Sequence, residues 1–291
     1  MAAAGPDNPW LSRRVLAYAH QGGAKEAPSS TMYALRQAVA VGADALELDV
    51  HRTRDGHLVV CHDATVDRTT PSAGAIAGLT LSEVSQLDNS YWFVPGSVVD
   101  HEAPDGAYPF RGRAPADRSF GIATLEDVLQ ELPAMPLNLD IKQTAPDVVP
   151  YEAELATLLT ERGRTDDVIV ASFHDSALDA FGALGTGVAT SCGPRAVTAL
   201  AVALAQGLPV PDEVRKHAAV QVPARFGGAD VVTMESVEVL HDAGLAVHVW
   251  TIDDEDEMER LVALGVDGII SDRPSALVAV LSSLGVRWHG E

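Results

Sequence analysis

The chain has 291 residues, 47% of them hydrophobic, and carries 20 basic against 41 acidic side chains, a net charge of −21. This length is enough for one large α/β domain, and such an acidic surface repels nucleic acid and anionic membranes. We therefore expect no nucleic-acid partner and no stable membrane association, and no apolar run in the sequence is close to the ~20 residues of a membrane span.

Short apolar and β-branched runs alternate with amphipathic stretches along nearly the whole chain, which is the pattern of parallel βαβ units. Strands are expected at 15–19, 45–50, 137–141, 168–172, 188–191, 219–222, 246–250 and 268–271. Helices are expected at 30–41, 125–131, 152–162, 176–184, 197–206, 236–243, 255–264 and 275–284. The predicted caps and stops of these helices are Thr124 and Ser236 at amino ends and Gly42, Gly163, Gly244 and Gly265 at carboxyl ends.

These eight strand–helix repeats predict a single domain over 1–291 with an α/β fold, a TIM-type (β/α)8 barrel whose chemistry lies at the carboxyl ends of the strands. The alternative is a doubly wound open sheet, for which Gly22-Gly23 is only a weak phosphate-binding loop. One segment, 89–121, lacks either period and holds six of the fifteen aromatic residues. It is either a functional lid or small inserted subdomain, or a loop whose aromatic side chains pack onto the barrel.

The two cysteines, Cys61 and Cys192, lie in apolar stretches far apart in the sequence. That placement fits buried free thiols in a reducing compartment better than a disulfide framework. Met1 is followed by a short Ala/Gly/Pro run and then by Arg13 and Arg14, which leaves no room for a cleavable apolar segment before the first strand. We expect a cytoplasmic protein, and the oligomeric state stays open.

Four residues in the first fifth of the chain carry the first functional signal: His20, Glu47, Asp49 and His62. Residues two apart on a strand point to the same face, so Glu47 and Asp49 project side by side. Adjacent carboxylates repel unless a cation or a proton lies between them. Taken singly, such acids are commonly solvated and such histidines structural. Their combination predicts metal-assisted acid–base chemistry on a phosphate ester.

A hairpin is expected to bring His62 to these acids. The dipeptide Asp55-Gly56 fits the two central positions of a tight turn. Counting outward from that turn pairs Asp49 with His62 across the two strands. We therefore expect His62 to lie beside the carboxylates.

The third and seventh strands add further candidates. Asp140 can complete an all-oxygen site with Glu47 and Asp49, and hard carboxylate ligands favour one divalent cation, Mg²⁺ or Ca²⁺, over zinc. Lys142, on the same face as Asp140, either contacts phosphate oxygens or only neutralises the acids around it. Trp250 either stacks on a glycerol or choline-like group or packs the barrel rim.

With these residues in place, the chain resembles the glycerophosphodiester phosphodiesterase family over almost its full length. The motifs that carry the resemblance are His20-Gln21-Gly22, Glu47-Leu48-Asp49, His62-Asp63, Asn138-Leu139-Asp140-Ile141-Lys142, Trp250-Thr251 and the segment 265–274. The resemblance implies a TIM-type barrel, a divalent cation on the three acids, and His20 and His62 as the acid–base pair.

Three positions differ from the family pattern. Gln21 stands where the family has Arg, which removes a cation expected to hold the phosphate, although Gln21 itself stays a candidate phosphate contact. Ser29 stands where the family has Glu. Asp140 replaces Glu and shortens the third carboxylate by one methylene, a feature that resembles the related sphingomyelinase D branch.

The resemblance implies a metal-dependent hydrolase that cleaves a small-molecule glycerophosphodiester to glycerol 3-phosphate and an alcohol. Water attacks phosphorus directly, or a neighbouring glycerol hydroxyl attacks first and gives a cyclic phosphate. Two alternatives stay open. One is a lysophospholipase D-like hydrolase whose aromatic insertion receives an acyl chain, and the other is a non-catalytic barrel that binds phosphate or phospholipid.

Overall fold

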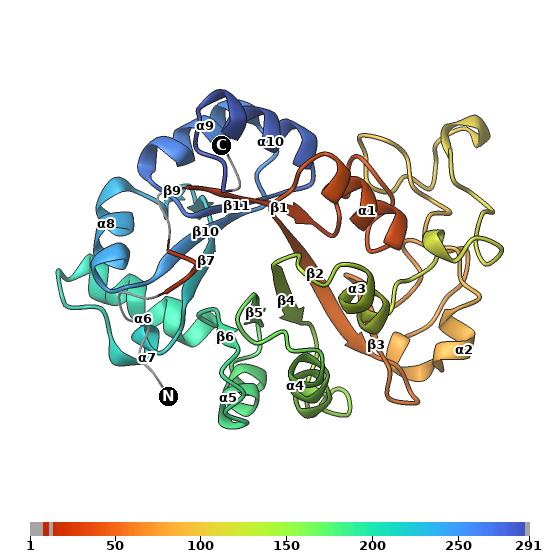
Figure 1. Ribbon diagram of the computed structural model, residues 1–291, viewed down its shortest axis with the longest axis horizontal. Helices are drawn as coiled ribbons and strands as arrows, with labels where there is room; N and C mark the ends of the chain where they lie inside the picture. The colour runs from red at the N-terminus through yellow and green to blue at the C-terminus, as the bar shows by residue number, and fades with distance from the viewer. Residues whose placement is uncertain (1–7, 12–13, 289–291) are drawn as a thin grey trace.

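The computed structural model describes residues 8–11 and 14–288, so Arg13 and the run before Asn8 lie outside the described residues. Eight parallel strands follow one another around the sheet in the order β6-β5-β4-β2-β1-β11-β10-β7 (Figure 1). The two ends of this order meet, because Ser191 forms a parallel bridge with Ala219 and the Cys192 amide donates to the Ala219 carbonyl at 2.9 Å. The predicted TIM-type barrel is therefore confirmed, and the open doubly wound sheet is wrong.

All eight predicted strands are present with small shifts at their ends. The barrel strands are β1 (Leu16–His20), β2 (Ala45–Arg52), β4 (Leu137–Ile141), β5 (Val168–Ala171), β6 (Ala189–Thr190), β7 (Ala219–Pro223), β10 (Ala246–Trp250) and β11 (Gly268–Ser271). Three short strands lie outside the barrel: β3 (Leu58–Val60), which pairs with β2, and the hairpin β8 (Arg225–Phe226) and β9 (Ala229–Asp230).

Helices cover the outside of the strands in the predicted alternation (Figure 1). They are α1 (Met32–Ala40), α3 (Leu125–Glu131), α4 (Glu152–Glu161), α5 (Asp175–Ala183), α6 (Pro194–Ala205), α8 (Met234–Asp242), α9 (Glu255–Leu264) and α10 (Pro274–Ser283), with the single turns α2 (Leu81–Val84) and α7 (Asp212–Arg215). Within the described ranges, no helix is both long enough and apolar enough to cross a bilayer.

The helix ends follow the predicted signals with two exceptions. Thr124 caps α3 as predicted, and the four predicted stop glycines all have positive φ. The predicted cap Ser236 is wrong, because Thr233 caps α8 and exchanges two hydrogen bonds with Ser236 as a capping box. Helix α6 begins at Pro194, before the predicted start, since a first helical residue needs no donor N–H.

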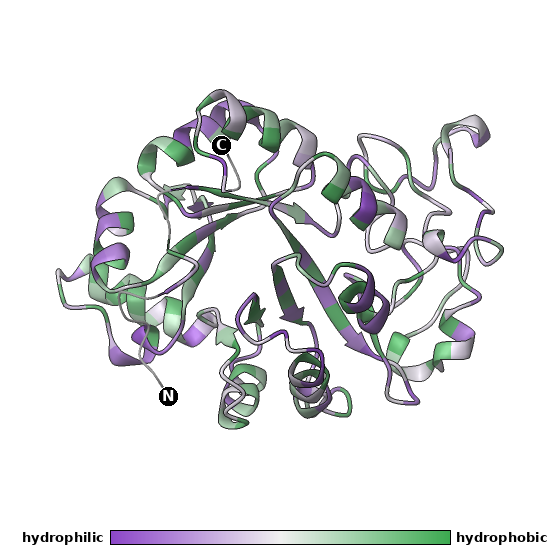
Figure 2. Ribbon diagram, in the orientation of Figure 1, coloured by the Kyte–Doolittle hydropathy of each residue, from purple (hydrophilic) through white to green (hydrophobic). Residues whose placement is uncertain are grey.

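Successive side chains of β2 point alternately outward to the hydrophobic core and inward to the barrel interior. Leu46, Leu48 and Val50 face outward and pack in a core cluster with residues of α1, α3 and α4. The residues between them, Glu47 and Asp49, therefore face the barrel interior. Figure 2 shows this mixture as hydrophilic stretches along β2, in contrast to the mainly hydrophobic β10 and β11.

The aromatic segment forms an irregular excursion at one side of the barrel, opposite α6 and α8 (Figure 1). It contains only the short 3-10 turns at Asp105–Ala107 and Arg118–Phe120. Its rings pack on one another and on the barrel: Tyr33 of α1 stacks on Phe120 at 4.8 Å between centroids. The guanidinium of Arg111 lies 3.4 Å from the ring centre of Tyr108.

Candidate active site at the carboxyl ends of the strands

A cavity of about 690 Å³ opens at the carboxyl ends of the barrel strands. Most of the predicted site residues line it: His20, Glu47, Asp49, His62, Asp140, Lys142 and Trp250. Gln21 is the exception, because its side chain is buried against His20 instead. The fold thus brings together residues from β1, β2, β4 and β10 and from the loop after β3.

The turn after β1 fixes the position of Gln21. Gln21, Gly22 and Gly23 all have positive φ, at 54°, 86° and 93°. A Cβ atom on Gly22 would lie 2.9 Å from the Cβ atom of Ala34, so only glycine fits there. The turn holds the Gln21 amide nitrogen 3.1 Å from Nε2 of His20.

Each of the two histidines is held by an aspartate. Nδ1 of His20 lies 2.6 Å from Oδ1 of Asp272, and Nδ1 of His62 lies 2.6 Å from Oδ1 of Asp63. A carboxylate partner keeps a proton on Nδ1, so Nε2 is the other ring nitrogen available for contacts. In His20 this atom lies 3.1 Å from the Gln21 amide nitrogen and 3.6 Å from Oε2 of Glu47. The ring centroids are 6.4 Å apart, with the planes at 86°. The two histidines therefore line the same part of the cavity.

The two aspartates differ in their own partners. Arg68 donates to both oxygens of Asp63, at 2.6 and 3.1 Å. Burial raises the pKa of Asp63, but the hydrogen bonds from His62 and Arg68 lower it further than burial raises it. Burial likewise lowers the pKa of His20, but the charge of Glu47 and the hydrogen bond to Asp272 raise it to about 9. The acids around His20 therefore favour its protonated form.

Strand pairing assembles the acids. Asp49 of β2 lies opposite Asp140 of β4. The ammonium of Lys142 lies 3.1 Å from Oδ1 of Asp49 and 3.3 Å from Oδ2 of Asp140. Burial raises the pKa of Glu47, and the charge of Asp49 raises it further. These acids form a buried negative cluster with one lysine as counter-charge.

Four buried oxygen atoms here have no hydrogen-bond partner: Oε2 of Glu47, Oδ2 of Asp49, Oδ1 of Asn138 and Oδ1 of Asp140. Unpaired buried acceptors are costly, and carboxylate and amide oxygens are the ligands that Mg²⁺ and Ca²⁺ take. Among the described residues, no three His, Cys, Asp or Glu side chains are placed so that they could hold a metal ion together. The chemistry of this donor set suits a hard cation, and Lys142 contacts the other carboxylate oxygen of Asp49 and of Asp140.

The hairpin after β2 differs from the predicted one. Thr53 pairs with His57, so the loop has three residues, and only Gly56 among them has positive φ. A three-residue loop with glycine in the left-handed position shifts the register by one residue. Asp49 therefore lies opposite Cys61, whose amide donates to the Asp49 carbonyl at 3.0 Å. His62 still lines the cavity, because the chain leaves the strand after Val60.

The sequence reasoning did not assign roles to the partners of the histidines, Asp63, Arg68 and Asp272. Asp63 and Asp272 stood inside motifs that had been singled out, so their positions beside strand ends were a usable signal. Pairing of Ala19 with Ser271 places Asp272 beside His20, and only closure of the barrel creates that neighbourhood.

Apolar side chains from several elements also line the cavity: Phe173, Val197, Ala201, Val222, Phe226, Val231 and Trp250. The same elements contribute polar side chains to the lining: Ser172, Ser191, Thr198, Gln221 and Thr251. The ring of Trp250 meets Phe173 edge to face, with centroids 5.9 Å apart. No residue of 89–121 is among the described residues that line this cavity, so the expectation that the insertion receives an acyl chain is wrong.

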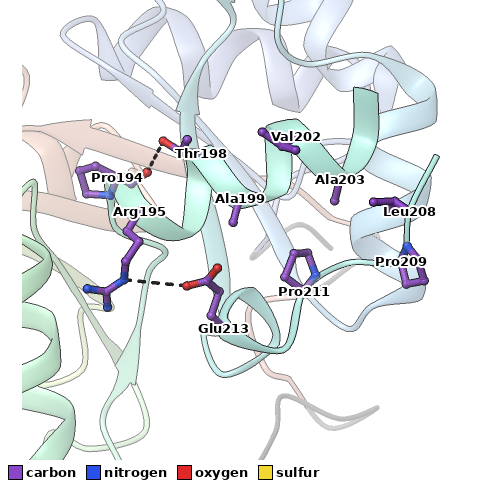
Figure 3. Close-up of a pocket in the computed structure, with 10 residues that line it drawn as sticks. All are labelled: Pro194, Arg195, Thr198, Ala199, Val202, Ala203, Leu208, Pro209, Pro211 and Glu213. Carbon is purple, nitrogen blue, oxygen red and sulfur yellow. Dashed lines mark hydrogen bonds and ion pairs between the residues drawn. The ribbon is translucent and has the colours of Figure 1, made fainter. Parts of the chain in front are cut away.

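A second groove, of about 620 Å³, lies on the outer face of α6 (Figure 3). Ala199 and Val202 lie along one side of it, and an ion pair between Arg195 and Glu213, 3.8 Å long, crosses its end. The groove is lined by neither a histidine nor an aspartate. Pro194 and Thr198 of α6 line both this groove and the active-site cavity.

The protein is a closed (β/α)8 barrel with two histidines and clustered acids at the carboxyl ends of its strands, which is where barrel enzymes have their active sites. The model of the glycerophosphoryl diester phosphodiesterase family matches residues 20–276 of the chain. The chain therefore belongs to this family, as its motifs had indicated.

Relatives match over nearly the whole length. A glycerophosphodiester phosphodiesterase of Caldanaerobacter subterraneus subsp. tengcongensis is 31% identical over 94% of this chain and 100% of its own. A probable glycerophosphodiester phosphodiesterase 2 of Mycobacterium tuberculosis is 31% identical over 94% of this chain and 93% of its own. A solved phosphodiesterase of Oleispira antarctica, in complex with the product sn-glycerol-3-phosphate, shares the fold, with a TM-score of 0.68, 24% identity and coverage of 94% and 99%.

Proposed function

We propose that this protein hydrolyses glycerophosphodiesters to glycerol 3-phosphate and an alcohol. The observation that carries the proposal is the pair of aspartate-bound histidines facing one cavity beside three acids and a lysine. In the direct route water forms a bond to phosphorus, the P–O bond to the alcohol breaks, and the alcohol takes one proton. In the other route a neighbouring glycerol hydroxyl loses its proton and bonds to phosphorus as the alcohol leaves with a proton, and water then opens the cyclic phosphate by breaking the new P–O bond. The names of the relatives and the bound product in the Oleispira antarctica structure support the same reaction.

The two histidines take opposite roles in the proposed reaction. His20 is protonated beside Asp272 and donates its proton to the leaving alcohol. His62, held by Asp63, accepts a proton from the nucleophile. Arg68 keeps Asp63 ionised, and Asp63 in turn keeps the His62 ring in one orientation.

A divalent cation, Mg²⁺ or Ca²⁺, would be held by Glu47, Asp49 and Asp140. When bound, it supplies positive charge that stabilises the negative charge accumulating on the phosphate. The unpaired carboxylate oxygens support this assignment. Lys142 is the second positive charge and would bind the phosphate oxygens.

Gln21 and Trp250 are the proposed remaining substrate contacts. Gln21 brings a neutral amide where the family has a cation, so its grip on phosphate is weaker than that of Arg. Its amide lies against Nε2 of His20, at the place where the leaving oxygen must approach. Trp250 presents its ring to the organic part of the substrate.

The cellular setting is proposed from composition. Cys61 and Cys192 are both free and buried, which supports a reducing, cytoplasmic compartment. The net charge of −21 supports a small-molecule substrate without a nucleic-acid or stable membrane partner.

An assay of purified protein with glycerophosphocholine, following glycerol 3-phosphate and choline, tests the proposal. We expect turnover that stops with a chelator and returns with Mg²⁺ or Ca²⁺. The Asp49→Asn variant should not recover with either ion, and it should also lose the rise in melting temperature that the ion gives the parent protein. Binding of the diester without release of choline at any concentration of these cations would instead identify a non-catalytic binding barrel.

A further inference from the structure

The aromatic insertion, residues 89–121, contacts the loops that follow both histidines, although the described residues that line the cavity include none of its members. We propose that Asn89, at the start of this insertion, is a positioning residue of the reaction. Its side chain connects the loop after β1, residues 21–31, to the loop after β3, residues 61–75. This inference rests on the proposed acid–base roles of the two histidines.

The side chain of Asn89 is buried, at 3% exposure, and both of its polar ends are used. Its amide nitrogen donates to the Ser29 carbonyl at 2.9 Å. A carbonyl oxygen only accepts, so the amide oxygen of Asn89 is left for the hydroxyl of Thr69, which donates to it at 2.5 Å. One side chain therefore holds two loops that are 40 residues apart in the sequence.

Ser29 lies next to the turn that holds His20. The Ser30 amide donates to the Gln21 carbonyl at 2.9 Å. The side-chain amide nitrogen of Gln21 lies 3.1 Å from Nε2 of His20. Gln21, Ser29 and Ser30 are all buried, so this short turn transmits the position of Asn89 to the first histidine.

Thr69 lies next to the arginine that holds the partner of His62. Arg68 donates to both carboxylate oxygens of Asp63, and Asp63 holds Nδ1 of His62. A shift of Thr69 displaces the adjacent Arg68, and the orientation of the His62 ring depends on this chain of contacts. Asn89 thus acts on the second histidine through Thr69.

Two more side chains of the insertion hold the same stretch of the loop after β3. Nε2 of His101 donates to the Arg68 carbonyl at 2.9 Å, and the indole N–H of Trp92 donates to the Thr70 carbonyl at 3.0 Å. Three successive residues of this loop, 68–70, are therefore bonded to the insertion. Of the three insertion side chains, Asn89 is the one that also bonds to the loop after β1.

The relative position of the histidines matters because both are proposed to act on one phosphodiester, and their ring centroids are 6.4 Å apart. Displacement of a reacting group by about 1 Å can lower the rate on the order of a hundredfold. The groups proposed to bind phosphate and cation lie on β2 and β4 or directly after them. Loss of the Asn89 connection should therefore lower kcat and leave KM nearly unchanged.

A conservative pair of substitutions at Thr69 tests this expectation. Thr69→Val removes the hydroxyl at nearly constant volume, and Thr69→Ser keeps it. With glycerophosphocholine, Thr69→Val should lower kcat on the order of ten- to a hundredfold with KM within about twofold of the parent value, and Thr69→Ser should keep kcat near that of the parent.

Thr190→Val is the matched control. The hydroxyl of Thr190 in β6 lies 2.8 Å from Nδ1 of the buried His217, and neither residue is among the described residues that line the cavity. The control should lower the melting temperature, as Thr69→Val does, and keep the parent kcat. Parent kcat in Thr69→Val, or an equal loss of kcat in Thr190→Val, would overturn the inference and leave the proposed function intact.

A double substitution tests whether Asn89 and Thr69 act through their shared bond. Asn89→Ala removes that bond from the other side, so adding Thr69→Val should lower kcat no further than Asn89→Ala alone. Losses that multiply in the double variant would show that the two residues act separately, which would contradict the proposed connection. Absence of turnover in the parent protein would remove the proposed function, and this inference with it.

Discussion

The charged and apolar sides of the active-site cavity are made in different ways. On the charged side, side chains at the ends of barrel strands hold one another, as Lys142 does with Asp49 and Asp140. On the apolar side, Val197 and Ala201 come from α6 and the exposed Phe226 comes from the β8–β9 hairpin, whereas Val222 and Trp250 lie on barrel strands. Interior strand positions are fixed by the whole sheet, whereas helix and hairpin positions can vary with little effect on it.

The residues proposed for catalysis lie on barrel strands or directly after strand ends. The apolar residues of the cavity come from helix α6, the β8–β9 hairpin and barrel strands. The aromatic insertion, which has more rings than either side, belongs to neither. Substitutions should therefore separate turnover, substrate choice and stability.

The largest expected effect is on the charged side. His62→Ala should lower kcat for glycerophosphocholine by about a thousandfold, because a positioned acid–base group contributes on that order. His57→Ala, on the exposed turn of the same hairpin, is the matched control and should keep full activity. Steady-state kinetics and melting temperatures check both. Normal turnover by His62→Ala would refute its catalytic role.

Removing a partner of a histidine should have the next largest effect. Asp272→Asn should lower kcat about a hundredfold, because the His20 ring loses its orienting charge. Asp272 helps to raise the pKa of His20 to about 9, so its loss lowers that pKa. The alkaline limb of the pH–rate profile should therefore move to lower pH. A uniform loss of rate with an unmoved limb would indicate only structural damage.

Two aromatic substitutions compare the insertion with the apolar side of the cavity. Trp92 is half-buried, with its indole N–H donating to the Thr70 carbonyl at 3.0 Å, so Trp92→Ala should cost roughly 2 kcal/mol of stability. Phe226→Ala should cost little stability, because the Phe226 ring is exposed. Urea unfolding measures the free-energy change of both variants. A large loss of stability in Phe226→Ala together with little loss in Trp92→Ala would contradict this assignment of the two regions.

At pH 6 and above, the smallest effect concerns a histidine in the interior of the barrel. His248 is buried, and burial lowers its pKa to about 3. The unfolded chain, with an ordinary pKa of ~6.5 at this residue, binds a proton that the folded chain rejects, so stability falls as pH drops from ~6.5 toward 3. This residue contributes a slope of up to ~1.4 kcal/mol per pH unit.

The measurement is the free energy of unfolding in urea at a series of pH values. His248→Gln should reduce the slope below pH 6.5, while His57→Gln on the exposed turn should leave it as in the parent protein. The acid slope should not vanish completely, because burial also lowers the pKa of His217, to about 4. An unchanged slope in His248→Gln would show that this histidine is not the source.

The repeating architecture and much of the charged side of the cavity could be predicted from local patterns in the chain. Apolar periodicity located all eight barrel strands, because each strand and helix must bury one face wherever it lies. Alternation placed Glu47 and Asp49 on one face before any neighbour was known. Because β4 is the parallel neighbour of β2, Asp140 then lies next to these two acids.

The hairpin register, the partner of His20 and the apolar part of the cavity depend on tertiary contacts. The sequence Asp55-Gly56 fits either a two-residue or a three-residue hairpin loop, and these differ in which residues have positive φ. In the folded protein only Gly56 of the loop has positive φ, which sets the register. Asp272 reached His20 only because the last strand closes against the first. The apolar side joins α6, a two-residue strand and β10, which share no local pattern. Local sequence encodes periodicity and turns, whereas these neighbourhoods arise from contacts between residues far apart in the chain.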